Sequence, residues 1–217
     1  MTLSPGFRLG SYEIRSRLGA GGMLPRFATA RRSRWLGMWL VAFIASGCAT
    51  TTFSAADTAA VDRLLGLIGQ RLDVAPAVAR VKWNTKAPIE DLPREKAIID
   101  GVTRRASEYG LDPAIAGSFF HGQIDASKTV QNRLHAEWTA ATHPPFTEVA
   151  DLERDIRPVL DRLTPLMMRG LADAVPVIQQ PGGRQLLDAR SKVLLSSSPE
   201  GGTAVQQAVG PLRQLAR

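Results

Sequence analysis

The sequence predicts an all-α fold, a single domain of about five or six helices that follows an N-terminal leader. Beyond Asp57, no stretch shows the sustained alternation of apolar and polar residues that is typical of strands. Apolar residues instead recur at spacings of three and four, as they do on one face of a helix. Clusters of proline, glycine and serine separate these runs. We therefore assign residues 1–56 to the leader and residues 57–217 to one helical domain.

The predicted helices follow one another along this domain. The apolar runs lie within residues 61–72, 98–106, 115–124, 156–166, 186–195 and 205–212. Turn-forming segments separate these runs, at residues 86–88, 110–113, 142–145, 181–183 and 196–202. Asp112 before Pro113 predicts a helix start, because its carboxylate can accept hydrogen bonds from free backbone amides and proline fits the first turn.

The formal charge of +7 is concentrated in the leader. Residues 1–56 hold seven arginines and one acid, Glu13, so the leader carries +6 and the rest of the chain +1. This distribution argues against a nucleic-acid partner. A single cysteine, Cys48, excludes an internal disulfide framework and a cysteine zinc site. The three histidines show no metal-ligand spacing, so no metal or cofactor is expected.

The leader has the pattern of an export signal. Four residues that include three arginines precede an apolar run at 35–47, and small residues follow it. A helix of that length spans only ~20 Å, which disfavours a permanent transmembrane anchor. Two processing routes remain open: cleavage after Ala56, or lipidation of Cys48 in a segment that resembles a bacterial lipobox. Both export the domain, to the periplasm or outside the cell, and only lipidation would attach it to a membrane. The residues before Met23 are interpreted as an over-extended start.

Two cations lie on otherwise amphipathic sequence. Arg71 and Lys82 are eleven residues apart, which returns them to nearly the same helix face at a separation of ~16 Å. Two long side chains that lean toward each other could bracket a small dianion, and Pro76 between them is expected to bend the helix. On spacing alone, the pair could equally be surface cations with their stems on the apolar face.

Three segments together resemble the secreted gamma-type AroQ chorismate mutases. The first runs from Arg71 to Glu95 and contains Lys82-Trp83, Pro-Ile-Glu-Asp at 88–91 and Arg94. The second is FFHGQIDASKTVQ at 119–131, which ends in Ser127 and Gln131, and the third is the Ile-Arg-Pro that contains Arg157. The resemblance covers residues 61–170, leaves 171–217 as a helical C-terminal part, and implies an AroQ-type helical bundle.

The resemblance also implies an activity and a set of site residues. Chorismate, a small dianion, would rearrange to prephenate without metal or cofactor, in a site that holds the folded conformer and stabilises charge on the ether oxygen. The family then assigns the carboxylates to Arg71 and Arg157, with Arg94 as a third cation at the ligand. It assigns the ether oxygen to Lys82 and Gln131, with Ser127 on the same helix face. Asp91 and Glu95 would contact the substrate hydroxyl and hold the arginines, and the protein would be a homodimer.

Two functions from different classes follow. The first is an exported chorismate mutase, an isomerase. The second is an exported helical binding or adaptor module that keeps the scaffold without catalysis. The cations separate the two hypotheses, because an adaptor has no use for Arg71, Lys82, Arg94 and Gln131 at the family's spacing.

Overall fold

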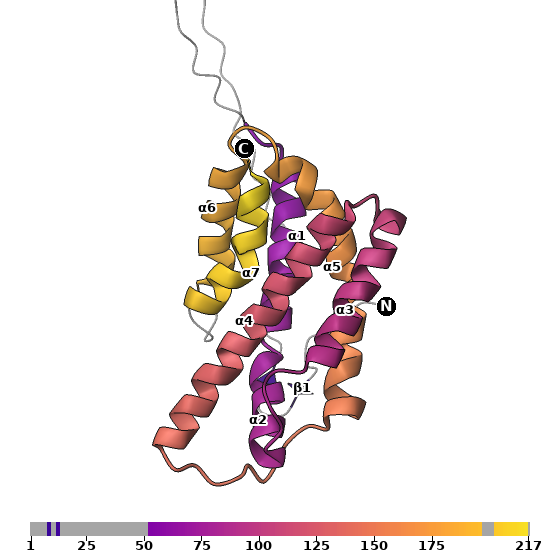
Figure 1. Cartoon of the computed structure of the whole chain (residues 1–217). Coiled ribbons are helices and arrows are strands. Elements are labelled where there is room, and N and C mark those ends of the chain that lie inside the picture. Colours follow the sequence, from indigo (N-terminus) through magenta and orange to yellow (C-terminus); the bar gives the residue numbers. More distant parts are fainter. Residues whose placement is uncertain (1–7, 10–11, 14–51, 197–201, 217) are drawn as a thin grey trace, which may run out of the picture. The chain divides into compact units, whose positions relative to one another are not determined.

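The computed structural model describes residues 8–9, 12–13, 52–196 and 202–216, and the chain divides into two units, Met1–Thr50 and Thr51–Arg217. In the first unit, strands β1 (Arg8–Leu9) and β2 (Tyr12–Glu13) form an antiparallel pair. The apolar segment 35–47 and Cys48 lie outside the described residues. The second unit is built from helices (Figure 1), so the prediction of an all-α domain is confirmed.

The described residues hold seven α-helices, one more than the upper end of the prediction. They are α1 (Ala55–Leu72), α2 (Ala75–Thr85), α3 (Leu92–Arg105), α4 (Pro113–Ala140), α5 (Arg157–Ile178), α6 (Gly183–Leu195) and α7 (Gly202–Leu215). A 3₁₀ turn, Ala106–Tyr109, follows α3, and a π turn, Leu152–Ile156, precedes α5. The extra helix arises because the first apolar run continues into α2 after a break at Asp73 and Val74.

That break changes the expected relation of the two cations. Arg71 lies in the last turn of α1 and Lys82 in the last turn of α2, so they do not share one continuous helix. Pro76 lies in the first turn of α2, where its missing N–H removes no hydrogen bond. The proline therefore starts a new helix and does not bend an existing one.

The folded unit begins before the predicted boundary at residue 57. Ser54 caps α1: its Oγ accepts the Asp57 backbone N–H at 3.0 Å, and its own N–H donates to the Asp57 carboxylate at 2.9 Å. This reciprocal pair satisfies two backbone donors of the first turn. Phe53, one residue earlier, packs against the core. The predicted start of α4 is confirmed, since Asp112 accepts the Ala114 N–H at 2.7 Å and Pro113 is the first helical residue.

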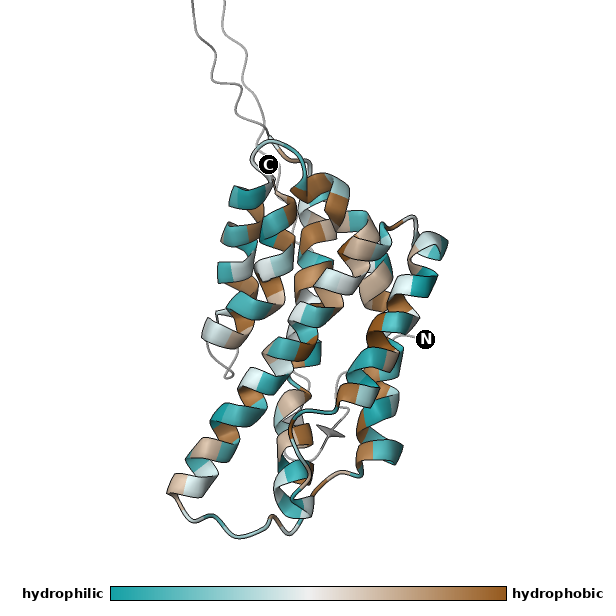
Figure 2. Ribbon diagram, in the orientation of Figure 1, coloured by the Kyte–Doolittle hydropathy of each residue, from teal (hydrophilic) through white to brown (hydrophobic). Residues whose placement is uncertain are grey.

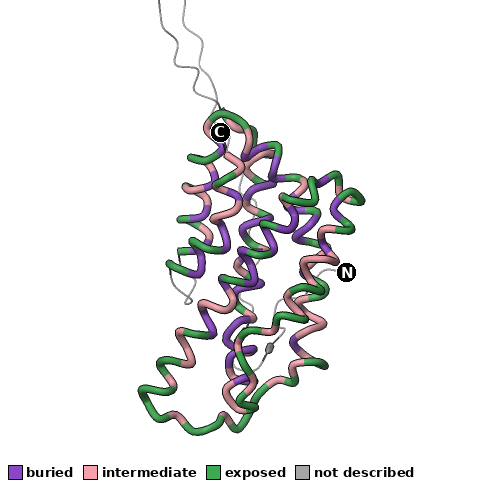
Figure 3. The backbone as a smooth tube through the Cα atoms, viewed as in Figure 1, coloured by how far each residue is buried: buried purple, intermediate pink, exposed green. Residues whose placement is uncertain are grey.

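The apolar core lies where α1, α4, α5, α6 and α7 meet (Figure 1). Brown, apolar residues recur along these helices in Figure 2, and the same segments carry most of the buried backbone in Figure 3. Fully buried side chains here include Leu64, Leu65, Phe119, Phe120 and Met167. In the part of the chain that the structure describes, no helix is long and apolar enough to cross a membrane.

The C-terminal part supports the longest helix. α7 packs along the first half of α4, and the Gln123 side chain donates to the Ala208 carbonyl oxygen of α7 at 2.8 Å. The approach is close at Gly122, where a Cβ would lie 2.7 Å from the Pro211 ring and 2.9 Å from the Gln207 carbonyl oxygen. The second half of α4 extends beyond α7 and packs against α2 (Figure 1), where His135 Nε2 lies 2.9 Å from the Ala79 carbonyl oxygen. Helix α3 instead runs beside the first half, where a Cβ on Gly117 would lie 3.4 Å from Thr103 Oγ1.

Candidate active site

The candidate site residues come from five helices of the second unit. Those residues are Arg71 in α1, Lys82 in α2, Asp91 at the cap of α3 with Arg94 and Glu95 in its first turn, Ser127 and Gln131 in α4, and Arg157 at the start of α5. The helices that carry them pack against one another, α1 on α5 and α4 on both α2 and α3. Electrostatic interactions and contacts link Arg71 with Arg94, and Lys82 with Asp91, Glu95 and Arg157. Ser127 and Gln131 contact each other on α4.

Arg71 is a buried cation beside a second arginine. Its exposed fraction is 7%, and its Nε is buried without a hydrogen-bond partner among the described residues. Burial, reinforced by the nearby charge of Arg94, lowers the pKa of Arg71 to about 10, and Asp161 opposes the shift. Arg94 donates to Asp161 of α5 at 2.7 Å. Arg71 therefore stays charged at neutral pH, with donor capacity that the fold leaves unused.

Lys82 is the second buried cation, with an exposed fraction of 9%. Its Nζ donates to the Ile89 carbonyl oxygen at 2.5 Å, in the loop before α3. Burial lowers the pKa of Lys82, the carboxylates Asp91 and Glu95 oppose that shift, and Arg157 and Lys128 add to it. An ammonium has three donors, so two remain beside the bond to Ile89.

Arg157 is delivered to the site by the π turn that precedes α5. Ile156, the last residue of that turn, is 2% exposed and packs with Val78 and Val81, which fixes the start of α5 against α2. The Arg157 guanidinium lies 3.7 Å from the Asp91 carboxylate and also pairs with Glu153. Asp91 at the same time caps α3 through the Arg94 N–H at 3.2 Å.

Glu95 is engaged at both of its oxygens. Oε1 accepts the Asp91 backbone N–H at 3.1 Å, and Oε2 accepts from Lys128 Nζ at 3.0 Å. Lys128 also lies 3.3 Å from Asp125 on its own helix. Sequence reasoning missed both Lys128 and Asp161. The spacing of Asp125 and Lys128 signals a helical ion pair, but nothing local indicates that the lysine reaches α3.

Ser127 and Gln131 meet as their four-residue spacing predicts. The Gln131 amide donates to Ser127 Oγ at 3.1 Å, and Gln131 is only 4% exposed. Gln131 Oε1 is buried without a partner among the described residues. The amide group therefore has hydrogen-bonding capacity left over within the bundle.

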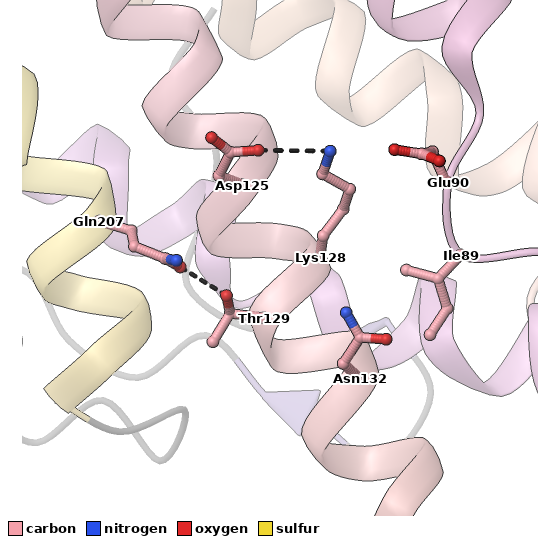
Figure 4. A pocket seen from close by; sticks show the side chains of 7 residues that line it. All are labelled: Ile89, Glu90, Asp125, Lys128, Thr129, Asn132 and Gln207. Carbon is pink, nitrogen blue, oxygen red and sulfur yellow. Dashed lines mark hydrogen bonds and ion pairs between the residues drawn. The ribbon is translucent and has the colours of Figure 1, made fainter.

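A cavity of about 420 Å³ lies on the neighbouring face of α4. It is lined by Ile89, Glu90, Asp125, Lys128, Thr129, Asn132 and Gln207. Figure 4 shows Asp125 and Glu90 on either side of the Lys128 ammonium. At 100° per residue, Lys128 lies between this face and the face of Ser127 and Gln131. The cavity is separate from the candidate residues, and Lys128 connects the two.

No group of three or more metal-ligating side chains occurs in the described ranges. The chemistry that the candidate residues can perform is electrostatic: several cations, two of them buried, with carboxylates placed between them. Such a cluster suits a small ligand with more than one negative charge.

Comparisons with known proteins agree with this chemistry. Residues 57–132 match the family described as chorismate mutase type II. The chain is 30% identical over 143 residues to a secreted chorismate mutase of Mycolicibacterium smegmatis, a match that covers 66% of this chain and 78% of the relative. It is 33% identical over 94 residues to a monofunctional chorismate mutase of Enterobacter agglomerans, where the match covers 43% of this chain and about half (52%) of the relative.

Among solved structures, the chain is similar to a chorismate mutase of Burkholderia thailandensis. The two share 38% sequence identity and superpose with a TM-score of 0.66, over 70% of this chain and 98% of the other. The shared part covers nearly all of the Burkholderia chain (98%), so the similarity is not confined to one motif.

Proposed function

Because this chain belongs to the chorismate mutase family, we propose that its buried cations catalyse the rearrangement of chorismate to prephenate. The observation that carries the proposal is the pair Arg71 and Lys82, whose charges are kept in the protein interior although burial lowers the pKa of each. Unpaired donors on such groups are expensive to bury unless a ligand uses them. A helical adaptor would gain nothing from that arrangement, so the adaptor hypothesis is not favoured.

In this reaction the protein forms no covalent bond with the substrate. One C–O bond breaks and one C–C bond forms within the substrate, with no proton transfer and no covalent intermediate. The protein has to hold the folded conformer and stabilise negative charge on the ether oxygen. Fixed cations in a dry site do both, since they lose little energy to reorganisation when the charge develops.

The arginines are assigned to the two substrate carboxylates. Arg71 and Arg157 would bind one carboxylate each, because a guanidinium fork sets orientation as well as charge. Arg94 would add a third cation beside Arg71. The carboxylates that pair with these groups, Asp91 with Arg157 and Asp161 with Arg94, hold them in place and moderate their mutual repulsion in the empty site.

Lys82 and Gln131 are assigned to the ether oxygen. Lys82 keeps two donors beyond its bond to Ile89, and one amide hydrogen of Gln131 remains beyond its bond to Ser127. Both groups donate without losing a proton. Glu95, whose oxygens already accept from Asp91 and Lys128, would accept the substrate hydroxyl through a remaining lone pair.

The protein is exported, as the secreted relative supports. The Ser54 cap and the packing of Phe53 favour processing upstream of residue 53, because cleavage after Ala56 would remove both. Losing such a cap typically costs about 1 kcal/mol. The mass of the mature protein from exporting cells tests this: a chain that retains Phe53, with or without a lipid at Cys48, is expected, and one that starts at Asp57 would contradict it.

We also propose a homodimer, as the family resemblance implies, in which each site lies within one chain. Light scattering should give twice the chain mass. Specific activity should stay constant on dilution through the dimer dissociation range, and a parallel loss of activity would show that the partner completes the site.

The direct test is the loss of chorismate absorbance on adding the purified chain from residue 52 onward, with prephenate identified as the product. The rate is expected to be unchanged after dialysis against EDTA. Chorismate that binds without turning over would instead support the adaptor.

A further inference from the structure

We propose that Lys128 is a positioning residue of this active site, which neutralises Glu95 and keeps the Lys82 ammonium available to the substrate. The inference rests on the proposed function and extends it to a residue that the family resemblance does not assign. It starts from the ion pair between α3 and α4, in which Lys128 Nζ lies 3.0 Å from Glu95 Oε2.

The pair is more sheltered than other ion pairs of the helical unit. The side chains of Lys128 and Glu95 are 23% and 19% exposed, whereas those of the pair Lys96 and Asp100 are 76% and 42% exposed. Charges that are partly shielded from water interact more strongly than exposed ones. Lys128 is therefore placed to control the charge of Glu95, whereas Lys96 is a solvent-exposed counterpart one residue further along the same helix as Glu95.

Glu95 connects Lys128 to the loop that holds Lys82. Its other oxygen accepts the Asp91 N–H at 3.1 Å, and two residues earlier the Ile89 carbonyl accepts from Lys82 at 2.5 Å. Glu95 also belongs to the groups whose charge raises the pKa of Lys82. The loop geometry and the electrostatics thus both couple Glu95 to Lys82.

A free Glu95 carboxylate would harm a site built for a dianion. It could take the Lys82 ammonium for itself, and it would repel the substrate carboxylates. Lys128 prevents both by occupying Oε2 and cancelling the charge. The charged groups around Lys82, Glu95 and Lys128 that enter this balance are Glu90, Asp91, Asp125 and Arg157.

The test is a double-mutant cycle that removes the two charges in turn, measured by chorismate turnover. Lys128→Gln should lower kcat/KM by about tenfold at pH 8, since an uncompensated, partly buried charge is left behind. Adding Glu95→Gln should restore most of that loss, because the pair is then neutral and the glutamine oxygen can still accept the substrate hydroxyl. Lys128→Arg should keep nearly full activity, and the matched control Lys96→Gln should match the wild type.

The separate kinetic constants give a second readout. The loss in Lys128→Gln should appear in kcat as well as in KM, because the uncompensated Glu95 carboxylate would attract the Lys82 ammonium and repel the substrate. The double variant should show neither change. A double variant that is as impaired as the two single losses combined, or a Lys128→Gln variant that behaves like the wild type, would overturn the inference while leaving the proposed function standing. A wild-type protein that does not turn over chorismate would contradict both the proposed function and the role of Lys128.

Discussion

The two halves of α4 lie in different surroundings. In the first half, Phe119 and Phe120 are 1% and 0% exposed, and the helix packs along α7. In the second half, the helix packs against α2, and its buried residues are Val130 and Gln131. Figure 3 shows the corresponding change from mostly buried backbone to half-buried and exposed backbone along the same helix.

This difference separates the origin of stability from the origin of the chemistry. Apolar burial contributes about 1.5–3 kcal/mol for each large side chain, so the first half holds the bundle together. Buried polar groups without full partners oppose folding, so the second half and the helices around it depend on that support. Substitutions in the two halves should therefore affect different measurements.

Phe120→Ala should give the largest effect, and that effect should be on stability alone. Loss of a fully buried phenylalanine costs about 3–5 kcal/mol through the lost transfer free energy and the cavity left behind. Urea unfolding measures it. At a temperature where the variant is folded, kcat and KM should stay near the wild-type values. A large drop in kcat with an intact fold would show that the two halves are not separable.

Gln131→Glu should instead lower the activity and leave the stability nearly unchanged. The wild type should keep a flat rate from about pH 5 to 8, because lysine and arginine do not change charge in that range at their ordinary pKa values. The variant should lose about 100-fold at pH 8, as is typical when one donor to a developing oxyanion is removed, and recover at acidic pH as the new carboxyl group regains its proton.

A paired pH–rate series makes this comparison. If the wild type falls steeply across that range, or the variant equals it at pH 8, Gln131 does not donate to the ether oxygen. In alkaline solution, the wild-type rate should begin to fall before the pH reaches 10.5, because burial lowers the pKa of Lys82 from that value.

Gly122→Ala should have a smaller effect, again on stability. The new Cβ would meet the Gln207 carbonyl oxygen at 2.9 Å and the Pro211 ring, so α7 must shift away from α4, at a cost of about 1–3 kcal/mol. The matched control is Gly101→Ala in α3, where nothing lies within 4 Å, and this variant should gain about 0.4–1 kcal/mol. Equal responses in thermal unfolding would contradict the close approach of the helices.

Lys82→Met should give the smallest change, a slight gain in stability at neutral pH of at most about 1–2 kcal/mol. The folded state lowers the pKa of Lys82 below its unfolded value, so the charged form opposes folding at pH 7. That penalty is relieved as the pH rises from the folded pKa toward 10.5. The difference in unfolding free energy between variant and wild type should therefore shrink in alkaline solution, and a variant that is less stable at every pH would contradict this.

Much of the fold could be predicted from the sequence because helix periodicity and helix caps are local signals. The Asp112–Pro113 start and the turn around Gly182 lie where the sequence indicated them, and Gly182 adopts a φ of 85° that favours glycine. The break at Asp73 was missed, since the apolar pattern continues across it, and Pro76, which starts the second helix, was interpreted as a bend in one continuous helix.

The candidate site likewise contains residues that could be predicted from the sequence and residues that could not. The meeting of Ser127 and Gln131 follows from helix geometry, and the family resemblance supplied the cations. Asp161 and Lys128 could not be found, because their partners Arg94 and Glu95 are long-range neighbours that only the tertiary structure brings together. The compensating charges thus depend on the packing, whereas the cations they support are visible in the sequence.

Lys82→Ala tests the central claim most directly, that a buried cation in the polar end of the bundle stabilises charge that develops during the reaction. The account predicts that kcat for chorismate falls by about two to three orders of magnitude, about 3–4 kcal/mol, while KM changes little. The exposed control Lys96→Ala should leave both constants unchanged. A rise in KM with kcat preserved would instead make Lys82 a ligand of the substrate carboxylates and contradict its assignment to the ether oxygen.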